Sequence, residues 1–385
     1  MPNIWSGALG PATQREVTTV PRSKRAFGAL GAIVLTASLA ACGSDDDGGG
    51  DAAATGSAGG SSAADEAQLT FVGYGGDGQD AMIKDWQEPY TAENSGVTFV
   101  NTSPPDVAQV KAQVEAGAVS WDVVAVAPAA AQQNCGTLFE EIDYSGVPEA
   151  DLVEQAVGEC YVGGFINSTP LAYRTDAFPD PSKAPKTVAD FFDTEEFPGQ
   201  RGFVTNVQNG ILEYPLLADG VAPDELYPLD VDRALEKLDS IRDDTTFAPN
   251  VGALQQAVGS GQVDMFFLPD SRLVPLLDQG TDITVVWDQT VTTLSAFAVP
   301  KGAPNAAAAG RFVSSLTSPT ASAAISEDLG TAPVNTSAEP QLSENQKAVE
   351  VYGPVNEGET VMQDVDWYAD NYNDVTAQLT NWLAG

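Results

Sequence analysis

Short apolar segments alternate with amphipathic ones from residue 68 onward, and this alternation restricts the possible folds more than any other feature. Two segments that separate apolar runs, residues 77–93 and 106–117, carry apolar side chains at helical spacing. The apolar runs have the length of strands: residues 68–73 (QLTFVG), 97–100 (VTFV) and 122–127 (DVVAVA). The order strand, helix, strand, helix, strand is typical of a parallel sheet flanked by helices, so the sequence predicts an α/β fold.

The later part of the chain contains further elements of both kinds. Strands are expected at residues 262–268, 283–287 and 295–299, and the clearest helices at residues 230–241 and 305–318. About 320 residues follow the N-terminal segments described next, and at the usual domain size this length allows two domains.

The N-terminal region has the layout of a secretory signal. A basic stretch, residues 22–25 (RSKR), precedes an apolar run at residues 26–41, which ends in LAA directly before Cys42. A cysteine in this position resembles the bacterial lipobox, so we predict a signal peptide at residues 1–41 and lipid attachment at Cys42. The alternatives are an ordinary signal peptide with an incidental cysteine or a short membrane helix, but the apolar run is short for a bilayer.

Residues 42–66 follow this signal and contain no large apolar side chain. Such a segment buries too little surface to offset its ordering entropy, so we expect a disordered tether. The sequence therefore predicts an exported protein that its lipid holds at the extracytoplasmic face of the cell membrane.

The composition excludes several functions. Asp and Glu number 54 against 17 Lys and Arg, and the formal net charge of −37 repels nucleic acid and anionic membrane surfaces. The chain has no histidine, which excludes Ser-His-Asp and Cys-His catalysis and removes the commonest zinc ligand. We therefore predict no catalytic residue, no metal site and no cofactor.

The three cysteines divide by position. If Cys42 carries the lipid, Cys135 and Cys160 remain, and two cysteines in an exported chain favour one disulfide. Two free thiols are the alternative.

A series of short motifs runs through residues 68–385 in a particular order. They are residues 72–76 (VGYGG), 115–117 (EAG), 121–124 (WDVV), 171–176 (LAYRTD), 190–193 (DFFD), 197–199 (FPG), 216–221 (LLADGV), 299–302 (VPKG) and 352–356 (YGPVN). Together they resemble the spermidine/putrescine-binding-like family, the extracellular solute-binding proteins of ABC importers.

The resemblance implies a two-lobed periplasmic-binding-protein-like fold of type II (a Venus flytrap), in which each lobe is a mostly parallel sheet flanked by helices. Lobe 1 would comprise residues 68–170 and 296–335, and lobe 2 residues 171–295 and 336–385, with the C-terminal helices as a brace. Such a protein, a monomer by default, would capture a small-molecule solute between the lobes and deliver it to an ABC permease.

The family's polyamine binders hold their ligand with aromatic side chains and carboxylates. In this chain, the matching positions are occupied by other residue types: the loop at residues 75–78 (GGDG), Gly210, Leu268, Thr293 and Ser295. The polyamine cage is therefore largely absent, and the ligand is expected to be polyamine-like or amino-acid-like.

Loops at the ends of strands are the candidate binding sites, because ligands of such sheets bind at their carboxyl edges. The candidates are Tyr74, Gly75, Gly76 and Asp77; Pro128; Thr205 and Asn206; and Asp270, Ser271 and Arg272. Arg272 could hold a carboxylate with two parallel hydrogen bonds. The alternatives are a plain tight turn at 74–77, a helix cap at 205–206 and a surface ion pair between Asp270 and Arg272.

Two other functions compete with solute capture. A lipid-anchored hydrolase that uses two carboxylates, such as a glycosidase, fits the abundance of Asp and Glu, although no paired motif singles any of them out. A surface interaction protein without a small ligand is the third possibility.

Overall fold

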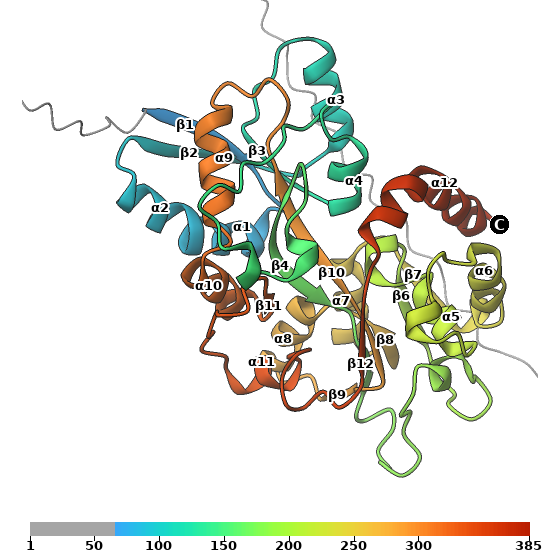
Figure 1. Ribbon diagram of the computed structural model, residues 1–385. Coiled ribbons are helices and arrows are strands. Elements are labelled where there is room, and N and C mark those ends of the chain that lie inside the picture. The colour runs from blue at the N-terminus through green and yellow to red at the C-terminus, as the bar shows by residue number, and fades with distance from the viewer. Residues whose placement is uncertain (1–65) are drawn as a thin grey trace, which may run out of the picture. The chain divides into compact units, whose positions relative to one another are not determined.

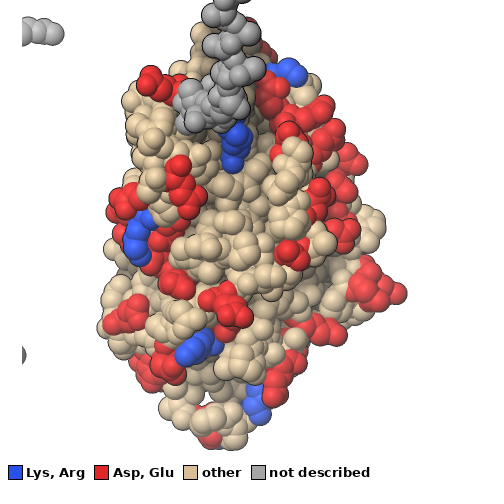
Figure 2. Space-filling view, turned by 60° about the vertical axis from the view of Figure 1, so that its left-hand side comes forward, with Lys and Arg blue, Asp and Glu red and all other residues tan. Residues whose placement is uncertain are grey.

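The computed structural model describes residues 66–385, which form two β-sheets flanked by helices (Figure 1). The predicted signal peptide, Cys42 and all of the predicted tether except its last residue lie outside the described residues. Within residues 66–385, no helix combines the length and the apolar composition needed to cross a membrane. Asp and Glu outnumber Lys and Arg on the face shown in Figure 2, in agreement with the composition.

The first sheet has seven strands in the order β11-β4-β10-β3-β1-β2, with β12 paired to β10. Their bounds are β1 Ala67–Val72, β2 Val97–Thr102, β3 Val123–Val126, β4 Val162–Ser168, β10 Gln289–Ala298, β11 Ala332–Pro333 and β12 Glu359–Met362. Because β1 pairs in parallel with both β2 and β3, the predicted parallel β-α-β-α-β unit is confirmed. The strand β10 runs antiparallel to β3 and β4.

Among the described residues, seven helical segments of at least five residues flank this sheet. They are α1 Gly76–Met82, a π-helical turn at Ile83–Gln87, α2 Glu88–Glu93, α3 Val107–Glu115, α4 Pro128–Gln133, α9 Ala306–Ser315 and α10 Pro319–Leu329. Aromatic rings pack the helices against the sheet: between ring centroids, Trp86 of the π-helical turn lies 5.1 Å from Phe297 of β10, and Phe312 of α9 lies 6.1 Å from Phe71 of β1. The disulfide predicted between Cys135 and Cys160 is confirmed, with their Cα atoms 5.3 Å apart.

The second sheet has five strands in the order β7-β6-β8-β5-β9. They are β5 Leu171–Arg174, β6 Arg201–Val204, β7 Thr245–Ala248, β8 Met265–Phe267 and β9 Ile283–Val286. The helices of this part are α5 Glu213–Ala218, α6 Val231–Asp239, α7 Val251–Gly259, α8 Asp270–Asp278, α11 Glu344–Ala348 and the C-terminal α12 Val365–Ala384. The pairs β6–β7 and β6–β8 are parallel, whereas β5 is antiparallel to both of its neighbours.

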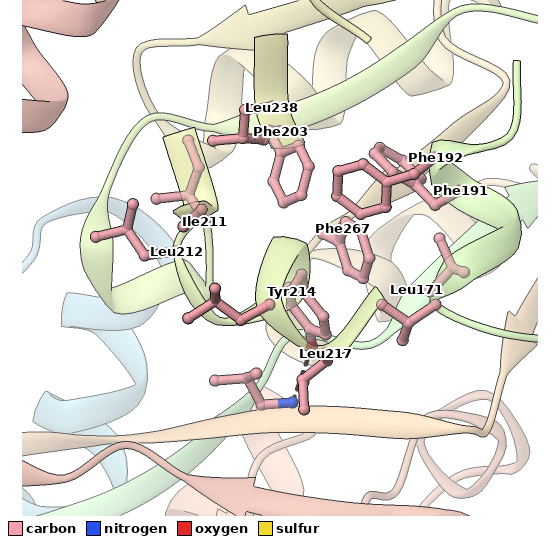
Figure 3. Close-up of a cluster of buried hydrophobic side chains, with 14 of the residues drawn as sticks. Leu171, Phe191, Phe192, Phe203, Ile211, Leu212, Tyr214, Leu217, Leu238 and Phe267 are labelled. Atoms are coloured by element: carbon pink, nitrogen blue, oxygen red, sulfur yellow. Dashed lines mark hydrogen bonds between the residues drawn. The ribbon is translucent and has the colours of Figure 1, made fainter. Parts of the chain in front are cut away.

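Aromatic side chains form the centre of the second core (Figure 3). The ring of Phe267 stacks on Phe203 at 4.8 Å and on Tyr214 at 3.8 Å between centroids. The buried Tyr214 hydroxyl donates to the carbonyl of Thr169 and accepts from the amide of Val291 at 2.8 Å. Since the chain passes from the first sheet to the second at Thr169 and returns before Val291, this core holds both crossing segments in place.

The first half of the described structure is the first sheet with its helices, and the second half is the second sheet with its helices. The C-terminal helix α12 contacts both halves. Gln133 of α4, beside the first sheet, donates its side-chain amide to the carbonyl of Ala369 at 2.9 Å. Arg242, which follows α6 beside the second sheet, donates to the carbonyl of Trp382 at 3.1 Å and lies 3.8 Å above its ring. The strand β12, which precedes this helix, belongs to the first sheet.

Candidate functional site

A cleft of about 630 Å³ is lined by residues from both halves of the structure. The first half contributes the loop between β1 and α1, parts of β4 and β10, and the end of α10. The second half contributes the loop after β6, the start of α8 and the start of α11. A groove of this size between two α/β units is where a small ligand of such a fold is expected to bind.

The loop after β1 contributes three of its four candidate residues to the cleft. Tyr74, Gly75 and Asp77 line it, and Gly76 is exposed beside them without lining it. Gly75 has a φ of 77°, and a Cβ atom there would lie 2.9 Å from Ser103 Oγ, so a larger residue would be both strained and crowded. The carboxylate of Asp77 is exposed in the first turn of α1.

The hydroxyl of Tyr74 turns toward β10. Although 44% of the residue is exposed, burial of the hydroxyl raises its pKa, and a hydrogen bond with Ser295 opposes the rise. Ser295 Oγ also accepts a hydrogen bond of 2.9 Å from the side-chain amide of Asn167 on β4. Tyr74, Ser295 and Asn167 therefore form a connected polar wall on the first half of the cleft.

The start of α8 places Ser271 and Arg272 in the cleft. Arg272 is half-buried, and it is the only lysine or arginine among the described cleft residues. Within residues 66–385, no ion pair or hydrogen bond of its guanidinium is found. Because this guanidinium has no such partner and lies next to the positive end of a nine-residue helix, it can bind the carboxylate of a ligand.

Asp270 does not line the cleft. It is 1% exposed, and its carboxylate accepts hydrogen bonds from Ser168 N, Ser168 Oγ and Ser271 N. The alternative of a surface ion pair between Asp270 and Arg272 is therefore wrong, because the carboxylate faces the interior and its hydrogen bonds go to these two serines. Asp270 can reach a ligand only through its neighbours.

The loop after β6 contributes Asn206, Gln208 and Asn209. Asn206 is exposed and also caps the turn that follows it, because its side chain accepts from Gln208 N at 3.0 Å. Thr205 does not line the cleft, since its hydroxyl donates to the carbonyl of Ala248 on the neighbouring strand β7 at 3.1 Å. In this loop, Asn206 thus both caps the turn, as the alternative expects, and lines the cleft.

Pro128 also lies outside the large cleft. It lines a small cavity of about 30 Å³ together with Gln363 and Tyr372 of the C-terminal segment. The position is at the start of α4, directly after β3, as the strand-end argument expects. The C-terminal segment approaches this strand end, which the sequence does not reveal.

Several polar cleft residues were not among the sequence candidates. Asn167, Thr293 and Ser295 lie within strands, where an isolated polar residue looks like a sheet position, and Ser343 and Gln346 belong to the capping box of α11. No local signal in the sequence marks these residues as cleft-lining. Only the resemblance to polyamine binders pointed to Thr293 and Ser295, as positions of the missing cage.

Most carboxylates that line the cleft have an ion-pair or hydrogen-bond partner. Asp328 pairs with Lys84 at 2.5 Å, Asp278 accepts from the Asn345 side chain at 2.7 Å, and Glu327 accepts from Gln341 N at 2.7 Å. Asp77 has no such partner in the described part of the chain. Within residues 66–385, no group of three or more acidic or cysteine side chains could hold a metal ion.

The cleft thus combines one cationic side chain, one unengaged carboxylate and a lining rich in amides and hydroxyls. Arg272 can bind a carboxylate, Asp77 can bind an ammonium group, and the neutral polar residues can hydrogen-bond the atoms between them. This combination matches a small zwitterion or polar acid.

Comparison with known proteins gives a consistent result. The family model for bacterial extracellular solute-binding proteins matches residues 85–351. The gamma-aminobutyric acid-binding protein of Pseudomonas aeruginosa is 28% identical over 329 residues, which are 83% of this chain and 92% of that protein.

Two solved structures are also similar. The Atu4243-GABA receptor has 33% sequence identity to this chain and a TM-score of 0.75, with 82% of this chain and 97% of that chain covered. The protein AgtB from A. tumefaciens R10, in complex with agropinic acid, has 30% identity and a TM-score of 0.71, with 83% and 99% covered. These similarities confirm the predicted two-lobed α/β fold.

Proposed function

Because the chain belongs to the bacterial extracellular solute-binding proteins, we propose that it captures a small amino-acid-like solute in its cleft and delivers it to an ABC permease. The proposal has three parts beyond family membership: the class of ligand, the transfer of that ligand to a permease and the lipid anchor at Cys42. The relatives are binding proteins rather than enzymes, which favours capture over the hydrolase alternative.

The observation that carries the ligand class is Arg272. It is a half-buried guanidinium in the cleft with no partner found within residues 66–385. Leaving such a cation without an anion is costly, so a ligand carboxylate is its natural complement. The named ligands of two relatives, gamma-aminobutyric acid (GABA) and agropinic acid, are both acids.

A polyamine ligand has less support. Three positions of the polyamine cage are Leu268, Thr293 and Ser295, so neither an aromatic wall nor a carboxylate stands there. A dication in the cleft would also lie beside the positive charge of Arg272. We therefore favour the amino-acid-like member of the two predicted ligand classes.

Titration with small solutes tests capture directly. We expect GABA or a related amino acid to release binding heat and to raise the free energy of unfolding by about 2.7 kcal/mol at 100 times its Kd. The measurements are calorimetry and a thermal-shift series, with putrescine and a neutral sugar as comparison solutes. The solute should be recovered unchanged, whereas a hydrolase would convert it. Failure of all amino acids to stabilise the protein would contradict the proposal.

The lipid anchor is tested at Cys42. We expect the full-length protein to fractionate with membranes, and Cys42→Ala to release it into the soluble extracytoplasmic fraction, because the thioether to the lipid cannot form. Cys135→Ala serves as a matched cysteine control and should stay with the membranes, since its disulfide lies in the folded part. A variant at Cys42 that remains on the membrane would show that the protein is held there by another means.

A further inference from the structure

Asp270 is a buried carboxylate for which the described structure provides donors but no cation. Its Oδ2 atom accepts from Ser168 N at 2.9 Å and from Ser168 Oγ at 2.8 Å, and its Oδ1 atom accepts from Ser271 N at 2.7 Å. Within residues 66–385, no charged group is found to act on this carboxylate. Buried charges in proteins are usually paired, so an unpaired one calls for an explanation.

The hydrogen bonds of Asp270 join two functional parts of the fold. Ser168 is the last residue of β4, just before the chain crosses from the first sheet to the second, and it pairs with Thr292 on the returning strand β10. On the other side, Ser271 and Arg272 directly follow Asp270 in the first turn of α8 and line the cleft. One carboxylate thus connects the crossing segment to the turn that carries the cleft guanidinium.

The stability contribution of Asp270 points away from a purely structural role. Burial raises its pKa to about 7, and the hydrogen bonds from Ser168 and Ser271 oppose the rise. Because this folded-state pKa lies above the ordinary value of 3.8, its contribution to stability is full below that value and is lost as the pH rises to about 7. Above neutral pH, the ionised side chain therefore destabilises the folded state relative to a neutral group.

We propose that Asp270 is a positioning residue, which fixes the first turn of α8 against the crossing segment and so holds Arg272 in place for the ligand carboxylate. The identity of that ligand rests on the proposed function. A carboxylate accepts from all three donors at once, whereas the amide of an asparagine in the same place leaves one N–H donor facing another. The turn would then lose part of its attachment to Ser168 or Ser271.

The test is Asp270→Asn, which keeps the shape and removes the charge. At pH 8, we expect calorimetry to show GABA affinity reduced about 10-fold, by analogy with the hydrogen-bonded partners that orient metal-ligating side chains. The urea midpoint should change little, because the loss of one hydrogen bond opposes the gain from removing a buried charge. A merely structural residue would instead lower stability and affinity together.

The pH profile supplies a second readout. The groups that face Asp270, Ser168 from β4 and Ser271 from α8, do not titrate. Below about pH 6, the protonated carboxyl of the wild type can donate its O–H to Ser168 Oγ while its oxygens still accept from both backbone amides, so the affinity difference between wild type and Asp270→Asn should persist there. Ser168→Ala removes only the hydroxyl donor and should reduce affinity less, by about 3-fold. An affinity difference that disappears at low pH would overturn the proposal, because the charge of Asp270 rather than its hydrogen bonds would then determine the affinity.

Hydrogen exchange without ligand separates this inference from the choice of solute. We expect faster amide exchange in peptides that cover residues 168–170 and 270–273 of Asp270→Asn, with the α5 core unchanged. If wild type does not bind GABA but this local change is seen, the ligand assignment is wrong and the positioning role stands. If exchange in the first turn of α8 is the same in both proteins, the positioning role is wrong.

Discussion

Replacing Arg272 with alanine is expected to weaken the binding of GABA or a related acid at least about 100-fold, which corresponds to ~3 kcal/mol. The guanidinium is half-buried in the cleft, and no other lysine or arginine lines the described cleft. Without it, the ligand carboxylate would be desolvated with no cation to bind it. Calorimetry at low and moderate salt gives the affinities of wild type and Arg272→Ala for the acid. The difference between them should persist at the higher salt, because salt screens a partly buried pair of guanidinium and carboxylate only weakly.

Two further variants sharpen this test. Arg272→Lys keeps the charge but not the planar pair of donors, so an intermediate loss of about 10-fold is expected. Arg233→Ala is the matched control: this arginine is exposed and pairs with Asp219, away from the cleft, so affinity should not change. Unaltered binding of putrescine by both wild type and Arg272→Ala, with no response to acids, would show that the carboxylate assignment is wrong.

Much of the fold could be predicted because its signals are local. The apolar runs around Phe71, Phe99 and Val124 lie in three parallel strands, as their order required. The expected helix at residues 77–93 exists as three consecutive helical pieces, the middle one a π-helical turn at Ile83–Gln87. A π-helical turn adds about one residue to an α-helical turn, so the spacing of the apolar residues hardly changes. Periodicity reports a helical segment well and its internal irregularities poorly.

The candidate site was less predictable because it is assembled from distant segments. The rule that ligands bind near strand ends found Tyr74, Asn206 and Arg272, all of which line the cleft. The same rule also selected Thr205, whose hydroxyl is satisfied by a neighbouring strand, and it overlooked Asn167, whose cleft position depends on the pairing of β4 with β10. Strand register is a tertiary property, and no pattern within one segment encodes it.

A substitution at Arg201 is expected to have the largest effect on stability, although the residue lies outside the cleft. Arg201 is completely buried, and its guanidinium donates to the carbonyls of Phe191, Asp193, Phe197 and Gly199 at 2.7 to 3.0 Å. Alanine would remove the guanidinium from all four acceptors, although the Asp193 carbonyl also accepts from Phe197 N at 3.1 Å, and it would create a cavity. We expect a loss of about 4 kcal/mol in the free energy of unfolding, measured by urea denaturation with circular dichroism.

The control for Arg201 also distinguishes stability from binding. Arg233→Ala, which removes an exposed ion pair, should change the free energy of unfolding by less than about 1 kcal/mol. At a temperature where Arg201→Ala is still folded, its affinity for GABA should match that of wild type, because the four carbonyls belong to the segment at residues 191–199 and not to the cleft. This result would be the reverse of that expected for Asp270→Asn, which should lose affinity and keep its stability. An Arg201→Ala protein as stable as wild type would mean that water replaces the guanidinium among these carbonyls at little cost.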